Sequence, residues 1–394
     1  MIILHIIFFV IFLYLAVSIA YFLVIAIAGR FGKLPLYTAH AHKKNICVII
    51  PSYKEDAIIV DTARKAAAHD YPAAHFTVMV VADSLQQETI AQLRAIPVTV
   101  VEANVSMKSR SLNAAFQIPP AGAFDIAVIL DADNVMAPGC LEKINDAFHQ
   151  GCRAVQCHRT AKNQHTSVAV LDAISEEINI NLFRRGPAVL GISAAPIGSG
   201  MAFDFELIKE IFSLPHILSN PGEDREIDMQ LMKRGIFMHF INDAYVYDEK
   251  VSSSAVFEKQ RVRWLEAQIN HVKRFADADM KGTPLGITGA AKLFQNLLLP
   301  RLLMIMVLGL FAVLLVLQQL FSFSILQPAP IYWWLMMAAY ALVLFLSVPA
   351  MFYNSKTLRA VAQVPVLMFS MVKALLKIKA GRKEFLHTPK VFKS

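Results

Sequence analysis

The chain has 394 residues, of which 56% are hydrophobic and only 17% are charged. This composition excludes a disordered protein and an ordinary water-soluble enzyme, and it indicates that part of the chain lies in lipid. The net charge is +8, and residues 351–394 hold nine lysines and arginines against one glutamate. A basic segment beside apolar ones favours contact with an anionic lipid bilayer over nucleic acid, because basic sequence with interleaved aromatics is absent elsewhere.

The N-terminal segment, residues 1–28, is apolar and contains no charged side chain apart from His5. As a helix it exceeds the roughly 20 residues that cross a bilayer. It is too long for a signal peptide and lacks a basic start, so we expect an uncleaved transmembrane anchor. Four lysines and arginines follow between residues 30 and 44. By the positive-inside rule, the domain after them is expected in the cytoplasm.

Residues 45–270 are more polar and have the pattern of a folded α/β domain. Four short apolar runs rich in β-branched residues predict strands that are buried on both faces. They lie at residues 46–50, 77–82, 98–101 and 126–130. Helical stretches separate them at residues 61–69, 88–95 and 109–117. This alternation predicts a doubly wound, mostly parallel sheet, in which ligands bind beyond the carboxyl ends of the strands.

The C-terminal part contains two more apolar runs long enough to span a membrane, within residues 297–353. We predict a transmembrane hairpin there, preceded by an interfacial segment at 271–296. Residues 357–378 are apolar between basic flanks, which favours an amphipathic helix on the cytoplasmic surface followed by a basic tail to residue 394. The alternative is a fourth span. The protein is therefore expected to be a multi-pass protein of the cell (inner) membrane.

The four cysteines form neither a C-x-x-C pair nor a zinc-binding spacing with histidine. They are expected to be free thiols in a reducing compartment. They are Cys47, Cys140, Cys152 and Cys157.

Two aspartates, Asp131 and Asp133, directly follow the fourth predicted strand. Their carboxylates would repel each other at a strand end unless they share a divalent cation. Mg²⁺ or Mn²⁺ accepts one or two protein carboxylates and completes its shell with phosphate oxygens and water. The alternative is a solvated loop, but the position after a buried strand favours a metal site.

The ends of the first two strands carry candidate nucleotide-binding residues. Pro51, Tyr53 and Glu55 follow the first strand, and Asp83 follows the second. They are expected to supply a wall and hydrogen-bond acceptors for a base and ribose. Neither a glycine-rich dinucleotide motif nor a Walker loop is present, so a metal and cations must hold the phosphates. Lys108 is a candidate cation, and a lysine facing water at a helix start is the alternative interpretation.

Two carboxylates, Glu223 and Asp224, stand before a helix that is expected to stop at Gly235. One interpretation is that either of them caps this helix. The other is a general base, because a carboxylate beside a metal-phosphate site can take the proton from an attacking hydroxyl group.

Gln260, Arg263 and Trp264 share one face of a predicted helix that runs toward the membrane. Arg263 is suited to offset phosphate charge and Trp264 to stack on a sugar ring. The alternative is an interfacial tryptophan flanked by cations.

Taken in chain order, these motifs resemble those of the membrane-bound glycosyltransferases of family 2, which include cellulose, chitin and hyaluronan synthases. The resemblance covers about residues 45–270, and its most specific element is the Q-x-x-R-W motif. The motifs are Asp83, Asp131-Ala132-Asp133, Glu223-Asp224 and Gln260-Arg261-Val262-Arg263-Trp264. Residues 80–83, 112–113, 198–201 and 388–390, together with Lys108, also look like the smaller exopolysaccharide-type members.

This resemblance implies an A-type glycosyltransferase fold and inverting, metal-dependent transfer from a nucleotide-sugar such as UDP-GlcNAc or UDP-glucose. The acceptor would be a saccharide or a lipid-linked molecule of cell-envelope or exopolysaccharide synthesis. Carried over by residue, it implies that Asp83 lies near the uridine and that Asp131 and Asp133 bind the nucleotide and the metal. It implies that Asp224 is the base beside Glu223. The same likeness makes Gln260, Arg263 and Trp264 a platform for the pyrophosphate and the acceptor.

Three other functions compete with this interpretation. A lipid-directed sugar or sugar-phosphate transferase would use the same metal crevice. A glycoside hydrolase could use Asp224 and Asp131 as its carboxylate pair, but it leaves the nucleotide-like strand ends unexplained. A nucleotide-binding transporter requires ionisable residues inside its spans, whereas residues 301–353 contain only Arg301, at the edge.

Overall fold

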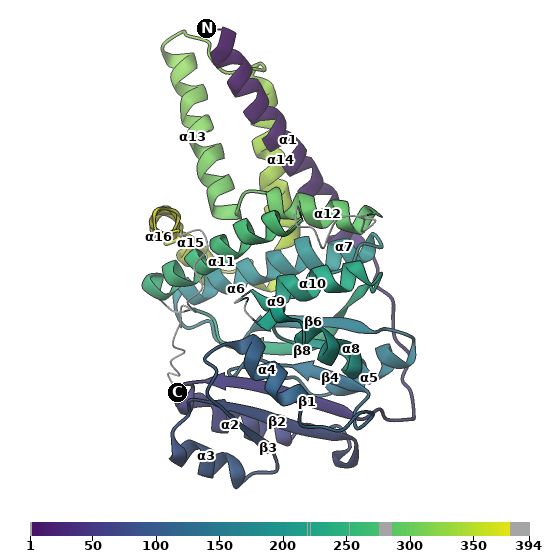
Figure 1. The fold of residues 1–394 in the computed structure, drawn as a ribbon. Helices are drawn as coiled ribbons and strands as arrows, with labels where there is room; N and C mark the ends of the chain where they lie inside the picture. Colours follow the sequence, from purple (N-terminus) through teal and green to yellow (C-terminus); the bar gives the residue numbers. More distant parts are fainter. Residues whose placement is uncertain (1, 219, 221, 252, 276–285, 379–394) are drawn as a thin grey trace.

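The structure is a computed structural model that describes residues 2–218, 220, 222–251, 253–275 and 286–378. An α/β domain carries three long helices that rise from one of its ends (Figure 1). A layer of helices lies between these long helices and the sheet.

The first half of the sheet is parallel, as predicted. Its strands are β1 (Ile46–Tyr53), β2 (Phe76–Asp83), β3 (Thr99–Ala103) and β4 (Ile126–Ile129), in the spatial order β3-β2-β1-β4. The helices between them are α2 (Asp56–Ala67), α3 (Gln87–Arg94) and α4 (Lys108–Phe116), with a short 3₁₀ turn η1 (Ala73–His75). Alternate residues of β1 pack against α2 on one face and α4 on the other. Because both faces are covered, the strand is apolar throughout.

The second half of the sheet is mixed and was not predicted. Its strands are β5 (Val135–Met136), β6 (Ala154–Ala161), β7 (Met201–Asp204) and β8 (Met238–Asp248). They complete an eight-stranded sheet in the order β3-β2-β1-β4-β7-β6-β8-β5. Strand β7 runs antiparallel to both β4 and β6, so it joins the parallel half to a second half with a different chain direction.

The remaining helices of the domain pack around this second half. They are α5 (Cys140–His149), α6 (Ser167–Ile180), the π-helix η2 (Asn181–Arg185), α7 (Gly186–Val189), α8 (Phe205–Phe212), α9 (Pro215–Leu218), α10 (Glu223–Lys233), α11 (Ser254–Arg274) and α12 (Gly286–Leu297). Of these, α6, α7, α10, α11 and α12 form the layer beneath the long helices (Figure 1). The backbone after α10 turns at Gly235, whose φ of 64° is in the left-handed region. The expected stop at this glycine is therefore confirmed.

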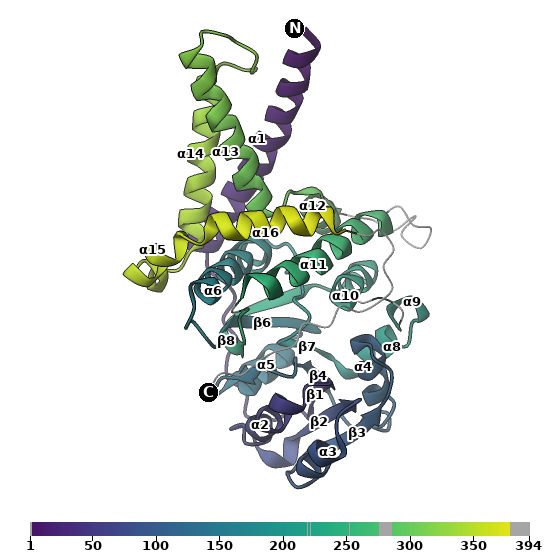
Figure 2. The ribbon, with the colours of Figure 1, turned by 90° about the vertical axis from the view of Figure 1, so that its left-hand side faces the viewer.

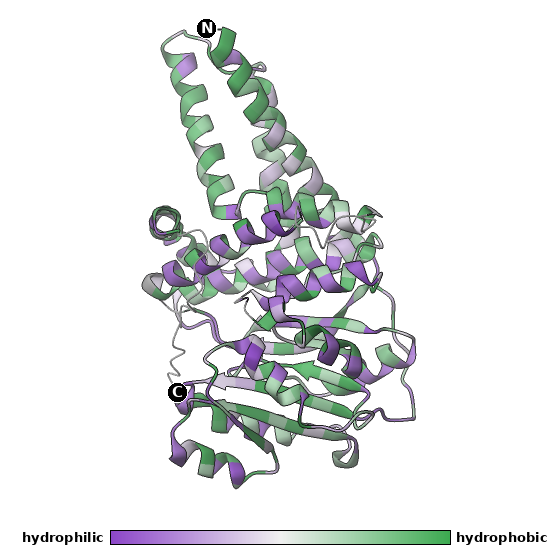
Figure 3. Cartoon of the chain, viewed as in Figure 1, coloured by the Kyte–Doolittle hydropathy of each residue, from purple (hydrophilic) through white to green (hydrophobic). Residues whose placement is uncertain are grey.

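Three helices are long and apolar enough to cross a membrane, and they match the predicted segments: α1 (Ile2–Phe31), α13 (Arg301–Leu320) and α14 (Pro330–Ser347). Trp333 of α14 is fully buried between the other two, with ring centroids 5.1 Å from Phe12 and 4.4 Å from Phe311. The three helices are coloured mainly as hydrophobic (Figure 3), and many large apolar side chains on their outer faces are exposed. Such faces are compatible with lipid because each helix satisfies its own backbone hydrogen bonds.

The three long apolar helices are attached to the α/β domain through close packing and polar contacts. A Cβ atom on Gly29 of α1 would lie 1.8 Å from Asn181 Oδ1, so only glycine allows this approach to η2. Asn181 Nδ2 donates to Ser347 Oγ of α14 at 3.0 Å. At the start of α13, Arg301 Nη1 donates to Asn179 Oδ1 of α6 at 2.8 Å. These contacts fix the orientation of the domain relative to the three helices.

The segment predicted as an amphipathic helix forms α15 (Ser355–Val361) and α16 (Val364–Leu376), which follow a short turn η4 (Ala350–Phe352) and are bent by 46°. Helix α16 lies across the base of the three long helices (Figure 2). Its buried Met371 and Ala374 pack on α11, whereas Phe369 is 62% exposed. The bent pair is also long and apolar enough for one span. Its interfacial position stays a prediction.

Two predicted segments lie partly or wholly outside the described residues. They are the basic tail from residue 379 onward, which includes the family-like residues 388–390, and residues 276–285 of the expected interfacial segment. The four cysteines are all described, and all are free and buried as expected. Burial raises the pKa of the Cys47 thiol to about 12, so this thiol is unreactive at neutral pH.

Candidate active site

Lys108, the first residue of α4, joins two of the predicted motifs. Its Nζ atom lies 2.6 Å from Asp131 Oδ1 and 3.2 Å from Glu223 Oε1, and it donates to the carbonyl oxygen of Gly198 at 2.6 Å. Burial alone would lower the pKa of Lys108, but the two carboxylates raise it to about 12. The side chain is 21% exposed. The interpretation of Lys108 as a lysine facing water is therefore wrong.

The two aspartates after β4 are held by backbone and side-chain groups from other elements. The backbone N–H of Asp131 donates to Ser199 Oγ at 2.8 Å. Asp133 is fully buried, and its two oxygens accept hydrogen bonds from Asn134 Nδ2 at 3.2 Å and from the backbone N–H of Glu249 at 3.3 Å. The carboxylate of Asp133 is therefore fixed in position rather than solvated, whereas the side chain of Asp131 is 26% exposed and is held by Lys108.

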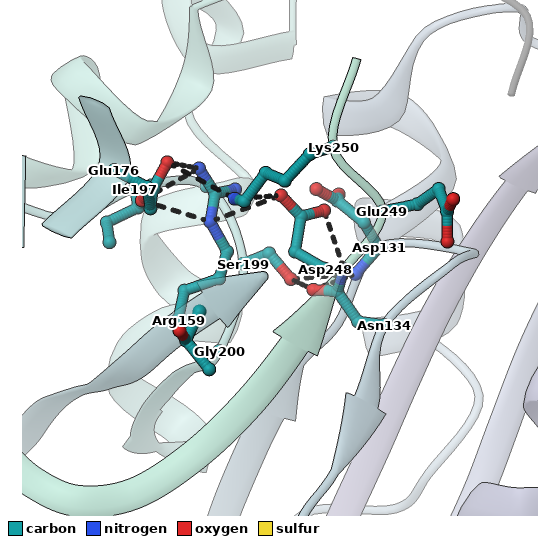
Figure 4. A network of polar contacts seen from close by, with 12 residues as sticks. Asp131, Asn134, Arg159, Glu176, Ile197, Ser199, Gly200, Asp248, Glu249 and Lys250 are labelled. Atoms are coloured by element: carbon teal, nitrogen blue, oxygen red, sulfur yellow. Dashed lines mark hydrogen bonds and ion pairs between the residues drawn. The ribbon is translucent and has the colours of Figure 1, made fainter. Parts of the chain in front are cut away.

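Asn134 is the centre of a polar network that the sequence did not predict (Figure 4). Its Oδ1 atom accepts a hydrogen bond from Ser199 Oγ, and its Nδ2 atom donates to Asp248 Oδ1 at 3.2 Å. Asp248 Oδ2 in turn lies 2.8 Å from Lys250 Nζ. Asn134 thus connects both aspartates to the end of β8.

Behind Asp248, a buried ion-pair cluster holds the ends of β6 and β8 on α6. Arg159 of β6 makes two hydrogen bonds from Nη2 to the carboxylate of Glu176, at 3.1 and 3.2 Å. Lys250 Nζ lies 3.5 Å from the same carboxylate. Strand β8 was not predicted, which is why its polar C-terminal end was not recognised as part of the site. The alternating pattern of Tyr245, Val246 and Tyr247 before Asp248 is the signal that could have indicated it.

We expect Asn134→Ala to weaken the apparent affinity for Mn²⁺ about 10-fold, because it removes the donor to Asp133 and the acceptor for Ser199. The measurement is activity as a function of Mn²⁺ concentration. Thermal unfolding recorded on the same samples separates loss of fold from loss of metal affinity. An unchanged Mn²⁺ dependence would show that the network does not position the carboxylates.

Glu223 and Asp224 are the first two residues of α10. The N-cap residue is Gly222, so the interpretation of either acid as the N-cap is wrong. Burial raises the pKa of Glu223, while Lys108 opposes the shift and Asp224 adds to it. A Cβ atom on Gly198 would lie 3.7 Å from both Asp224 Oδ2 and Lys108 Nζ. Gly198 has a φ of 87°, which favours glycine, and its missing side chain leaves space between the base candidate and the lysine.

The predicted nucleotide residues follow strands β1 and β2, with one difference. Pro51 and Tyr53 belong to β1 itself, because this strand stays paired with β2 after its pairing with β4 has ended at Ile49. The carbonyl of Ile49 accepts from Leu130 on the β4 side. Pro51, two residues later, faces the same side, where pairing with β4 has already ended. Its lack of an N–H group therefore costs the sheet no hydrogen bond. Glu55 is the N-cap residue of α2.

Asp83 is fully buried and binds groups of its own chain. Its Oδ1 accepts from the backbone N–H of Val105 at 3.2 Å, and its Oδ2 accepts from Ser111 Oγ at 3.0 Å. It therefore orders the loop before α4. The non-glycine residues Lys54, Ser84 and Ser106 near these strand ends all have positive φ values. Such strained turns cluster at functional sites.

On α11, Trp264 contacts Arg261, a residue to which the sequence analysis gave no separate role. Its guanidinium lies 4.1 Å from the Trp264 ring centroid and donates to Asp172 Oδ1 at 3.0 Å. Gln260 Oε1 is buried without a hydrogen-bond partner. The roles of Gln260, Arg263 and Trp264 toward a substrate stay predictions.

The donor set fits a metal ion that arrives together with a nucleotide diphosphate. Among the residues that the structure describes, no three Asp, Glu, His or Cys side chains converge to hold an ion by themselves. Asp131 and Asp133 nevertheless offer two carboxylates at one strand end. Mg²⁺ and Mn²⁺ commonly take one or two carboxylates plus phosphate oxygens, so these residues fit such an ion.

The fold and this site define a glycosyltransferase with the A-type fold. A mannosyltransferase, PcManGT from Pyrobaculum calidifontis in complex with GDP-Man and Mn²⁺, has a similar structure, with a TM-score of 0.57 and 17% identity over 92% of this chain and 97% of that one. Residues 42–267 match the model described as glycosyltransferase like family 2, and the chain belongs to this family.

Other comparisons are weaker. The structure of residues 1–349 of S. aureus TarS aligns with a TM-score of 0.43 and 13% identity, over 84% of this chain and 91% of that one. A second TarS structure aligns with a TM-score of 0.38 and 15% identity, over 63% and 44% of the two chains. A search of curated protein sequences gave no match.

Proposed function

We propose that this glycosyltransferase moves a sugar from a nucleotide-sugar to a saccharide or lipid-linked acceptor, with inversion and with Mg²⁺ or Mn²⁺ as cofactor. The observation that carries the proposal is the contact of Lys108 with both Asp131 and Glu223, with Asp224 across the gap at Gly198. Three motifs from distant parts of the chain thus meet at one place. They bring together Asp131 as a metal ligand, Asp224 as a proton acceptor and Lys108 as a cation that can contact phosphate.

Each chain residue has a defined task in this mechanism. Asp131 and Asp133 would hold the metal ion, which when bound would neutralise charge on the leaving diphosphate. The oxygen of the acceptor hydroxyl group bonds to the anomeric carbon as the bond from that carbon to the diphosphate breaks, and Asp224 accepts the proton of the hydroxyl group. Lys108 stays protonated and adds positive charge beside the diphosphate. One displacement inverts the anomeric centre.

The other predicted residues belong to the two substrate-binding sides of the site in this proposal, where the buried Asp83 acts by ordering the loop before α4. Pro51, Tyr53, Glu55 and Asp83 form the nucleotide side of the site. Gln260, Arg263 and Trp264 form the pyrophosphate and acceptor side on α11. The donor is a nucleotide-sugar such as UDP-GlcNAc or UDP-glucose, and the process is cell-envelope or exopolysaccharide synthesis at the inner side of the cell membrane.

Release of nucleoside diphosphate tests the proposed function. Purified full-length protein in nanodiscs is incubated with UDP-GlcNAc, UDP-glucose and GDP-mannose, the last because PcManGT was solved with GDP-Man. At least one donor should be turned over with Mn²⁺ or Mg²⁺, and EDTA should lower the rate at least about 100-fold, because the developing charge then lacks its counter-ion. Turnover that is insensitive to EDTA, or the absence of turnover with every donor tested, would contradict the proposal.

The membrane topology has its own test. Sugar nucleotides are made in the cytoplasm, and the basic residues after the first span favour a cytoplasmic domain. A reporter fused after residue 394 should therefore give a cytoplasmic signal. An external signal would make α15 and α16 a fourth span. A second reporter after residue 44, before β1, should be cytoplasmic in either case and serves as the control.

A further inference from the structure

The turn that follows α6 links the long apolar helices to the loop before β7. This turn is the π-helix η2, which interrupts an otherwise continuous helix from α6 to α7. Single π-helical turns inside α-helices are rare and occur frequently at functional sites. Asn181 at its start donates from Nδ2 to Ser347 Oγ of α14 at 3.0 Å, and Arg184 near its end contacts the loop at residues 195 and 196. Because η2 is bound to α14, it is a fixed base for the side chain of Arg184.

The guanidinium of Arg184 is directed at backbone carbonyl groups. Nε donates to the carbonyl oxygen of Ala195 at 2.9 Å, Nη2 donates to that of Pro196 at 3.1 Å, and Nη1 donates to that of Asn179 at 3.3 Å. Arg184 is 9% exposed, and burial lowers its pKa to about 10, an effect that Glu176 partly offsets. The group therefore stays protonated at neutral pH. Its planar set of donors fixes several carbonyl groups at once, which the single donor atom of a lysine cannot do.

The loop that this guanidinium holds leads directly into the candidate active site. Only Ile197 separates Pro196 from Gly198, and the N–H of Ile197 donates to Gln156 Oε1 at 3.0 Å. The carbonyl oxygen of Gly198 then accepts a hydrogen bond from Lys108 Nζ at 2.6 Å. A shift of the loop at residues 195 and 196 would therefore move the acceptor that holds the lysine.

The backbone at Gly198 also sets the distance between two groups of the proposed mechanism. A Cβ atom there would lie 3.7 Å from Lys108 Nζ and 3.7 Å from Asp224 Oδ2, so the chain runs between the cation and the base. A displacement of about 1 Å of such groups can cost on the order of 100-fold in rate, even when its cause lies outside the reacting atoms. The contacts that fix this loop consequently matter for catalysis.

We propose that Arg184 is a positioning residue of the transfer reaction. By holding the carbonyl groups of Ala195 and Pro196, it fixes the backbone at Gly198 and keeps Lys108 in its place beside Asp131. Arg184 acts through this loop and has no contact with the substrates. The inference rests on the proposed function, because it takes Lys108 as the cation beside the diphosphate.

A double-mutant cycle between Arg184 and Lys108 tests this inference. Full-length protein in nanodiscs is assayed with the donor that the wild type turns over, and kcat/KM for this donor is measured at saturating Mn²⁺. Arg184→Gln should lower kcat/KM about 100-fold, because the loop loses the donors that hold it. In the Lys108→Ala background the same substitution should lower kcat/KM less than about 3-fold, because the cation that Arg184 positions is already absent.

Two further variants complete the experiment. Arg184→Lys keeps the charge and one donor atom, so its kcat/KM should be intermediate, and it replaces Arg184→Gln in the cycle if that variant does not fold. Arg234→Gln is the matched control, because Arg234 also donates to a backbone carbonyl group, that of Gln230 at 3.2 Å, but at the far end of α10 from Asp224. Its kcat/KM should equal that of the wild type.

Thermal unfolding of every variant separates positioning from stability. A loss of stability alone lowers the folded fraction by the same factor with and without Lys108, so its effect on kcat/KM would be equal in both backgrounds. Equal losses in the two backgrounds, or wild-type kcat/KM in Arg184→Gln, would overturn the inference. So would the failure of both Arg184 variants to fold while Arg234→Gln folds. Absence of turnover in the wild type would refute the proposed function itself, on which the inference depends.

Discussion

Asp224→Asn is expected to lower kcat about 1,000-fold while leaving the KM for the donor nearly unchanged, because the amide cannot accept the proton of the attacking hydroxyl group. The amide keeps the size of the carboxylate and retains an Oδ1 atom for the N–H of Arg225. Initial rates of sugar transfer at saturating Mn²⁺ measure the effect.

A matched control for this change is Asp61→Asn. Asp61 lies on the exposed side of α2 and pairs with Lys65 one turn away, at 2.6 Å. An exposed pair of this kind contributes less than about 1 kcal/mol, so activity should stay at the wild-type level. If Asp224→Asn retained normal kcat, Asp224 would not be the base. If Asp224→Asn weakened donor binding together with lowering kcat, Asp224 would instead belong to the donor-binding side of the site.

Asp133→Ala is expected to have the second largest effect, a loss of activity of at least about 100-fold that added Mn²⁺ or Mg²⁺ does not restore, because it removes one of two carboxylate ligands. Asp133 is fully buried between Asn134 and the N–H of Glu249. Activity across a wide range of metal concentrations measures this loss.

The stability of the variant must be followed beside its activity. Removing Asp133 takes away the acceptor of the Glu249 N–H and one of the two acceptors of Asn134 Nδ2, which keeps its bond to Asp248. Some loss of thermal stability therefore accompanies the loss of function. Asp243→Ala is the control for the substitution of an aspartate by alanine. Asp243 lies on β8 and forms an exposed ion pair with Lys143 of α5. If EDTA treatment and Asp133→Ala both left turnover intact, the metal assignment would be refuted for this pair of residues.

The parallel half of the sheet could be predicted because its signals are local. The strands β1, β2 and β4 are covered on both faces, so each appears in the sequence as a short apolar run. Strand β8 is different. It alternates buried and partly exposed residues over Met238–Asp248 and contains a register shift opposite Cys157 and His158. A local apolar pattern does not reveal such a strand, and its partner β6 is determined by long-range pairing.

Within the site, the sequence indicated the acids and Lys108 but not what holds them. Packing ruled out the water-facing interpretation of Lys108 and the N-cap interpretation of Glu223, since Lys108 lies against Gly198 and Glu223 while Gly222 takes the N-cap position. The roles of both residues in catalysis stay predictions. Asn134 carries no separate motif, and its role depends on Ser199 and on the end of β8.

The chain by itself determined the three long apolar helices, the first four strands and the acidic motifs, because hydrophobic length and side-chain chemistry are properties of neighbouring residues. Only the tertiary structure decided which motifs meet and which groups support them. Lys108, Asp131 and Glu223 are brought together by strand order and by the placement of α4 and α10. Contacts of this kind depend on three-dimensional distance, which sequence spacing does not record.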